Sequence, residues 1–336
     1  MTGLRLCRVV VCPVALLLQC TAVWGEDGLD TSPKSGHGAF DANAPKAVAL
    51  KQDLGSLWTM KMSGSGTVTV TNTSLSVVFT SRNNWTISTI ECQGQMVVGQ
   101  FGSNGSVMRD VAGIWYGTGH GKETVSSFEV IVDGASREFV SGTVLTGTDV
   151  VLRKQSTMGY LDHEARITFP ASGDRLIQEH DYVVREGYAA NFRFLYAFMH
   201  MNCNDYNLWL AQLDGDQELE GQAGHMNNAF SLERDVKAVT FYSPSRGRGV
   251  SYVYPEVYPG DDFSGAAAIK NSIWDRRHDN KLYFNPDLRR LNLNTGDRFG
   301  FRLDVIPFAA EATKWRDIGR GLSQEGIPRS TDVRPE

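Results

Sequence analysis

Polar and titratable side chains follow the most apolar, aromatic run of the chain, which spans residues 188–207. Alternation in a strand puts Tyr196 and His200 on one face and Arg193 on the other. Polar groups at the exit of a buried strand, here His200 and Asn202, are often placed in sites. In a lyase, a Tyr or His abstracts the proton next to a uronic carboxylate, and Arg, Asn or His neutralises that carboxylate. The run therefore predicts His200 and Tyr196 as catalytic and Arg193 and Asn202 as substrate-binding. The alternative is a core strand that ends in an ordinary polar turn.

A second candidate pair, His180 and Tyr182, lies in a segment where carboxylates flank a histidine. A neighbouring carboxylate raises the proton affinity of a histidine, but neighbours in a strand point to opposite faces. His180 therefore shares a face with Gln178 and Tyr182 instead. We predict a catalytic His180 and a substrate-binding Tyr182, against the alternative of a partly exposed structural pair. The segment 162–164 has the same carboxylate–histidine–carboxylate pattern.

Three further residues are candidates because of the loops and aromatics around them. His120 ends a glycine-rich loop, where backbone can approach a ligand closely, although most such loops are tight turns. His225 lies in a Gly/Asn-rich loop. Both are predicted to bind substrate. Glu256 lies among tyrosines that could stack on sugar rings, and is the predicted catalytic carboxylate if the reaction is hydrolysis or epimerisation. The histidines lack the compact spacing of a zinc site, so no metal ligands are predicted and the cofactors stay open.

The elements around these residues are predicted to be strands. About seventeen short, β-branched or alternating segments follow one another with little helical pattern between them, which excludes a doubly wound α/β fold. We predict an all-β, large antiparallel sandwich over residues 46–308. Only residues 307–322 carry apolar side chains at helical spacing, which predicts one C-terminal helix over 309–322. Residues 323–336 are predicted to be a disordered tail.

The N-terminal residues are predicted to direct export. Arg5 and Arg8 precede an apolar stretch and then small residues, which is the order of a secretory signal peptide over residues 1–25. Residues 26–45 are rich in Gly, Ser, Asp and Pro and predict a flexible leader. Cleavage would leave Cys92 and Cys203, either as a disulfide or as two separately buried thiols. No stretch of the mature chain has membrane-spanning length.

The charge and composition of the chain limit the classes of binding partner that we expect. The net charge is −5 and no Lys/Arg cluster occurs, so nucleic-acid binding is not expected. Aromatic residues make up 10% of the chain, with seven Trp, which suits a sugar-binding surface as well as a large β core. The oligomeric state is left open.

The strand order, the hairpin signal at residues 132–134 and the late segment 274–284 resemble the galactose-mutarotase-like β-supersandwich. The resemblance covers residues 46–308. It implies a carbohydrate ligand, since sugar epimerases and domains of polysaccharide lyases and glycosidases have this fold. We therefore predict a secreted protein that acts on or binds a polysaccharide or oligosaccharide, as a lyase-type or hydrolase-type enzyme. The alternative is a noncatalytic sugar-binding or envelope structural protein.

Overall fold

The fold was analysed in a computed structural model, in which the chain divides into two units, Met1–Pro45 and Lys46–Glu336. All described residues belong to the second unit. They are residues 57–99, 103–110, 112–117, 121–185, 190–202, 205–213, 217–222, 230–231, 236–259, 270–276 and 281–324. For residues 103–104, 190–202, 230–231, 254–259, 270–276 and 281–293 the description covers the backbone alone.

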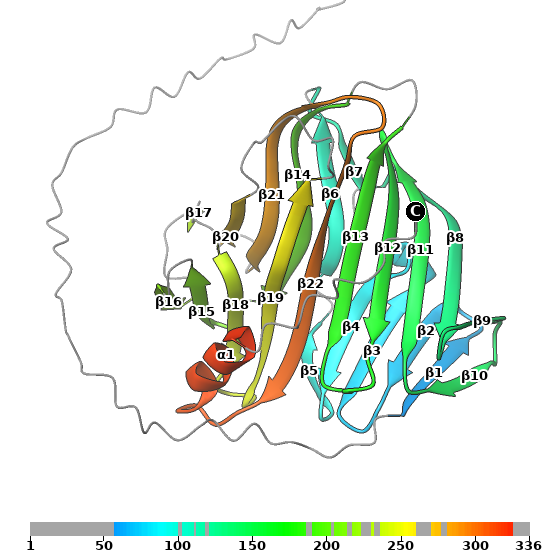
Figure 1. Ribbon diagram of the computed structural model, residues 1–336. Helices are drawn as coiled ribbons and strands as arrows, with labels where there is room; N and C mark the ends of the chain where they lie inside the picture. Colours follow the sequence, from blue (N-terminus) through cyan, green and yellow to red (C-terminus); the bar gives the residue numbers. More distant parts are fainter. Residues whose placement is uncertain are drawn as a thin grey trace, which may run out of the picture. The chain divides into compact units, whose positions relative to one another are not determined.

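The first of two antiparallel sheets has 12 strands, in the order β10-β1-β2-β3-β4-β6-β14-β21-β20-β17, with β5 and β7 paired to β4 and β6 (Figure 1). A short 3-10 helix, η1 (Ser81–Asn83), connects β3 to β4. The strands are β1 (Trp58–Ser63), β2 (Thr67–Thr71), β3 (Leu75–Thr80), β4 (Thr86–Cys92), β5 (Gln95–Val98), β6 (Ser103–Asp110), β7 (Trp115–Gly117), β10 (Val144–Gly147), β14 (Ala190–Asn202), β17 (Phe230–Ser231), β20 (Lys270–Arg276) and β21 (Lys281–Leu293).

The second sheet has 10 strands, in the order β16-β15-β18-β19-β22-β13-β12-β11-β8-β9. Its pairings are antiparallel, as the alternating sequence pattern predicts for a sandwich. The strands are β8 (Glu123–Val132), β9 (Ala135–Arg137), β11 (Val150–Met158), β12 (Leu161–Phe169), β13 (Leu176–Val184), β15 (Leu208–Leu213), β16 (Glu218–Gln222), β18 (Val236–Ser243), β19 (Arg248–Pro259) and β22 (Arg298–Ala309).

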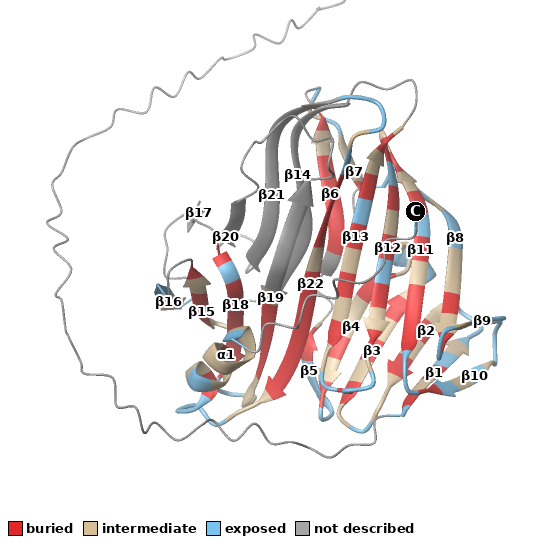
Figure 2. Cartoon of the chain, in the orientation of Figure 1, coloured by how far each residue is buried: buried red, intermediate tan, exposed pale blue. Residues whose placement is uncertain are grey.

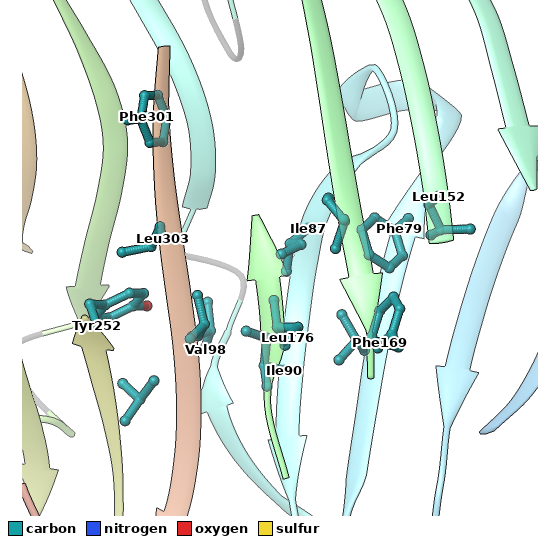
Figure 3. Packing of buried hydrophobic residues seen from close by; sticks show 14 of the residues in the cluster. Phe79, Ile87, Ile90, Val98, Leu152, Phe169, Leu176, Tyr252, Phe301 and Leu303 are labelled. Atoms are coloured by element: carbon teal, nitrogen blue, oxygen red, sulfur yellow. The ribbon is translucent and has the colours of Figure 1, made fainter. Parts of the chain in front are cut away.

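The core lies between the two sheets. One continuous cluster of buried apolar side chains draws on both sheets, and Figure 3 shows part of it. Trp58 of the first sheet meets Phe169 of the second at a ring-centroid distance of 5.0 Å. Burial alternates residue by residue along β12 and β13, visible as banding in Figure 2. This alternation is the expected result of packing only one face of each strand against a partner sheet.

Two local predictions are confirmed. The aromatic run forms β14, which lies at the centre of the first sheet between β6 and β21. The hairpin signal forms the turn from β8 to β9, with Val132 opposite Ala135. Asp133 and Gly134 occupy this turn with φ of 49° and 77°, the two positive values that a type I′ turn requires.

The C-terminal helix exists but begins later than predicted. It is α1 (Trp315–Gln324), and residues 307–309 belong to β22. Pro307 is tolerated in β22 because β13 begins at Leu176, opposite Val305. Beyond that point no described strand pairs with this edge of β22. Phe308 still packs with Trp315, and with Leu210 and Tyr242, because strand and helix cover the same apolar surface.

Two further predictions concern the pairing of the cysteines and membrane-spanning segments. Cys92 is a buried free thiol, and burial raises its pKa; Cys203 lies outside the described residues. No helix in the described part of the chain is long and apolar enough to cross a membrane.

Candidate functional site

Four predicted site residues lie on the central strand β14. The register sets Tyr196 opposite Val107 of β6 and His200 opposite Tyr283 of β21. Their side chains are outside the described part of the chain, as is the side chain of Glu256 on β19; His120 and His225 lie outside it entirely. The roles of these residues stay predictions. The four residues on β14 are Arg193, Tyr196, His200 and Asn202.

His180 and Tyr182 lie on the inner face of β13, on the same side, as alternation predicts. Both are almost fully buried, at 4% and 1% exposure. The register sets His163 of β12 directly opposite Tyr182 and diagonal to His180. The His163 ring therefore stacks on both, with centroid distances of 4.6 Å to Tyr182 and 5.3 Å to His180. Three strands thus bring together a layer of parallel rings, which continues to Phe301 of β22.

A chain of hydrogen bonds runs through the two histidines. His163 Nε2 lies 3.0 Å from His180 Nδ1, and His163 Nδ1 lies 3.2 Å from Ser156 Oγ. Ser156 donates its single proton to Glu123 Oε1 at 2.9 Å, so its oxygen accepts the N–H of His163 Nδ1. The other nitrogen of a neutral His163 must then accept from His180 Nδ1. Within this chain each donor points toward Glu123, and Gln178 Oε1, 3.4 Å from His180 Nε2, can accept a hydrogen bond only from the other His180 tautomer.

The carboxylate of Glu123 accepts three hydrogen bonds at the end of this chain. Its Oε1 accepts hydrogen bonds from Lys154 Nζ at 2.8 Å and from Ser156, and its Oε2 accepts from Asn84 Nδ2 at 3.1 Å. The side chains of Lys154 and Glu123 are only 4% and 1% exposed. A buried carboxylate with this many donors is held in one position, because each lost donor would leave a charge unsolvated.

The surroundings fix the charge states. Burial lowers the pKa of His163 and, more strongly, that of His180, so both rings are neutral near pH 7. Burial alone would raise the pKa of Glu123, but the neighbouring His163 N–H and the Lys154 charge outweigh it and hold that pKa well below its usual range. Burial also raises the pKa of Tyr182, whose hydroxyl forms a short hydrogen bond with Ser106 of the facing sheet.

A small pocket lies beside the histidine pair, between the two sheets. It offers about 10 Å³ to the centre of a water molecule, which is room for about one water. Trp85 and Phe128, half-buried and stacked at 4.3 Å, form its aromatic wall. Its lining comprises Trp85, Thr86, Gly105, Ser106, Phe128, Leu152, Lys154, His163, Ala165, Ile167, Gln178 and His180. Among the described residues no group of three or more metal-ligating side chains occurs.

Sequence reasoning missed three members of this cluster, His163, Glu123 and Lys154, as site residues. A signal for Lys154 exists in the sequence, since it is the one charged residue on a strand face that also carries Val150, Leu152, Ser156 and Met158. A charge on such a face requires a buried partner. No sequence pattern identifies Glu123 as that partner, because the contact depends on the β8–β11 register and its irregularity at Gln155.

No protein-family model and no curated protein sequence matches this chain. Similar solved structures include a TPR-domain containing protein from Parabacteroides distasonis (11% identity, TM-score 0.45), the galactosidase domain of alpha-galactosidase-sucrose kinase (8%, 0.47) and a galactose mutarotase-like protein from Clostridium acetobutylicum (8%, 0.44). They cover 80%, 75% and 76% of this chain, which spans 50% and 42% of the first two proteins and 99% of the third. At these identities the likeness concerns the fold alone, and the fold resembles that of galactose mutarotase-like proteins, as the sequence predicts.

Proposed function

We propose that this chain is a carbohydrate-active protein that contacts a polysaccharide at the pocket beside His163 and His180. The observation that carries the proposal is a pair of neutral, hydrogen-bonded histidines lining a pocket whose outer wall is the Trp85–Phe128 stack. Perturbed titratable groups in a concave site mark functional sites, and aromatic rings suit the apolar face of a sugar. The pocket, rather than the names of the similar structures, supports this assignment.

Of the two predicted reaction types, the pocket favours the lyase type. Hydrolysis requires two carboxyl groups flanking the scissile bond, and no carboxylate lines this pocket in the described part of the chain. A neutral imidazole, by contrast, can accept the proton next to a uronic carboxylate. In the hydrogen-bond chain described above the available unprotonated nitrogen is His180 Nε2, and the proton would pass from His180 through His163 and Ser156 toward Glu123. A pocket of this size admits only the edge of a sugar, such as one oxygen.

The test is β-elimination on a panel of uronic-acid polysaccharides, followed by the ultraviolet absorbance of the unsaturated product. His163→Gln should lower the rate by about a hundredfold or more, the usual scale for losing an acid or base. Phe169→Leu, on the same inner face of β12 but away from the pocket, serves as a control for general loss of core packing. Equal losses in the two variants would contradict a catalytic His163.

The near-complete burial of both histidines favours a second candidate, a noncatalytic sugar-binding protein. In that case the wild type binds polysaccharide in calorimetry without forming product. Trp85→Ala should then weaken binding, while His163→Gln should leave the affinity unchanged once folding is verified. Absence of both binding and turnover across the panel would contradict the carbohydrate proposal as a whole.

We also propose that the chain is exported, on the signal-peptide pattern of residues 1–25. N-terminal sequencing of protein recovered from outside the cytoplasm should find the first residue near Glu26. A retained Met1 in that material would contradict cleavage.

A further inference from the structure

A single carboxylate holds an amine and a carboxamide that come from the two different sheets. Glu123 Oε1 accepts from Lys154 Nζ at 2.8 Å, while Glu123 Oε2 accepts from Asn84 Nδ2 at 3.1 Å. Lys154 lies on β11 of the second sheet, and Asn84 ends η1 in the first sheet. Glu123 therefore binds the Lys154 amine at one carboxylate oxygen and the Asn84 carboxamide at the other.

The backbone holds the carboxamide in this place. Asn84 and Trp85 are consecutive residues in the left-handed region, with φ of 53° and 56°. Asn tolerates this conformation, but it is costly for a bulky residue such as Trp and persists only where the surroundings enforce it. The Trp85 ring stacks on Phe128, and both rings line the pocket together with Lys154.

We propose that Lys154 Nζ and Asn84 Cγ become joined by an intramolecular amide bond, with Glu123 as the acid–base catalyst. Proton transfer from the Lys154 ammonium to Glu123 gives the neutral amine that the reaction needs and a neutral carboxylic acid. The amine attacks Asn84 Cγ and forms the new C–N bond. Glu123 delivers its proton to Nδ2 and then takes up the proton that Nζ releases, so it ends the reaction as the carboxylic acid. The Cγ–Nδ2 bond then breaks and ammonia leaves, so no oxidant, reductant or cofactor is needed.

Two features of the site suit this reaction. The adjacent pocket has room for about one water-sized molecule, and ammonia has that size. Glu123 also contacts both nitrogen groups, so the site needs no external acid or base. The bond would tie β11 of one sheet to the β3–β4 connection of the other, across the sandwich core.

Mass spectrometry of the wild-type protein decides the proposal without any variant. After denaturation and trypsin digestion, peptide 83–109 should be found joined to peptide 154–166. The joined species should weigh about 17 Da less than the two peptides together, the mass of one ammonia. Recovery of peptide 83–109 at its full mass, together with an unlinked peptide that begins at Lys154 or Gln155, would overturn the proposal.

Variants assign the roles of the three residues. Glu123→Gln and Lys154→Arg should each abolish the branched peptide, because the first lacks the acid–base group and the second lacks the amine. Lys314→Arg, at an exposed ion pair with Glu311, is the matched control and should retain the branched peptide. A branched peptide that persists in Glu123→Gln would exclude Glu123 as catalyst.

Stability provides a second readout. A cross-link that closes a loop of this length should raise the Tm by about 5–10 °C. Lys154→Arg keeps the positive charge beside Glu123 and should lose that increment, whereas Lys314→Arg should melt with the wild type. If the wild type contains the branched peptide but has the same Tm as Lys154→Arg, the amide bond forms without stabilising the fold.

Discussion

Replacing Glu123 with alanine should lower the free energy of unfolding by about 3–5 kcal/mol, because the change leaves the buried Lys154 ammonium without its carboxylate. The same change removes the acceptor of the Ser156 and Asn84 hydrogen bonds. Urea denaturation of the wild type and of Glu123→Ala measures the difference. Among the described pairs of Lys or Arg with a carboxylate, this one has the least exposed side chains, which is why its loss is expected to be large.

Glu164→Ala is the matched control for that experiment. Glu164 forms a bidentate pair with Arg153, the residue next to Lys154, but those side chains are 32% and 39% exposed. Solvent screening limits such a pair to about 1 kcal/mol or less. Equal losses in the two variants would contradict the importance of burial. The peptide masses of Glu123→Ala distinguish loss of the ion pair from additional loss of the proposed amide.

Acidification should unfold this protein over a pH range set by His163 and His180. Burial lowers both pKa values below that of the unfolded chain, near 6.5, so the unfolded state binds more protons than the folded state. The histidines therefore do not reduce stability above about pH 6.5. As the pH falls below that value, each ring that stays neutral in the folded state lowers the free energy of unfolding by up to about 1.4 kcal/mol per pH unit.

Glu123 adds to the same trend at lower pH. Its pKa is held below that of the unfolded chain, so its contribution is present above about pH 4.3 and is lost as the pH falls further. Lys154, the other charged group facing the histidines, lowers the pKa of His180 by electrostatic repulsion and so opposes its protonation. Both effects have the same sign, and acid destabilises the fold.

Urea denaturation at several pH values between 4 and 8 measures this slope. The double variant His163→Gln/His180→Gln should be less stable at pH 7.5 but should show a much flatter dependence between pH 6.5 and 5. A double variant with the slope of the wild type would assign the acid sensitivity to other groups.

Alternation along the sequence determined much of the fold. Short β-branched segments separated by turn residues predicted an antiparallel sandwich, because one face of each strand must be apolar to pack on a partner sheet. The same rule placed His180 and Tyr182 on one inner face. Sequence spacing was misleading from Pro307 onward. Apolar residues at helical spacing predicted one helix there, but the structure divides them between β22 and α1. Both elements cover the same apolar cluster, and spacing alone does not separate them.

The composition of the buried polar cluster was decided only by the tertiary structure. His163 meets His180 because β12 and β13 pair in one register, and a shift of β12 by one residue would have turned the His163 ring to the other face. Glu123 meets Lys154 across a bulged pairing, and it meets Asn84 only because the two sheets face each other. Local sequence sets which way a side chain points within its own strand. Which side chain it meets depends on strand pairing and sheet packing, which are set by the sum of many apolar contacts along the whole chain.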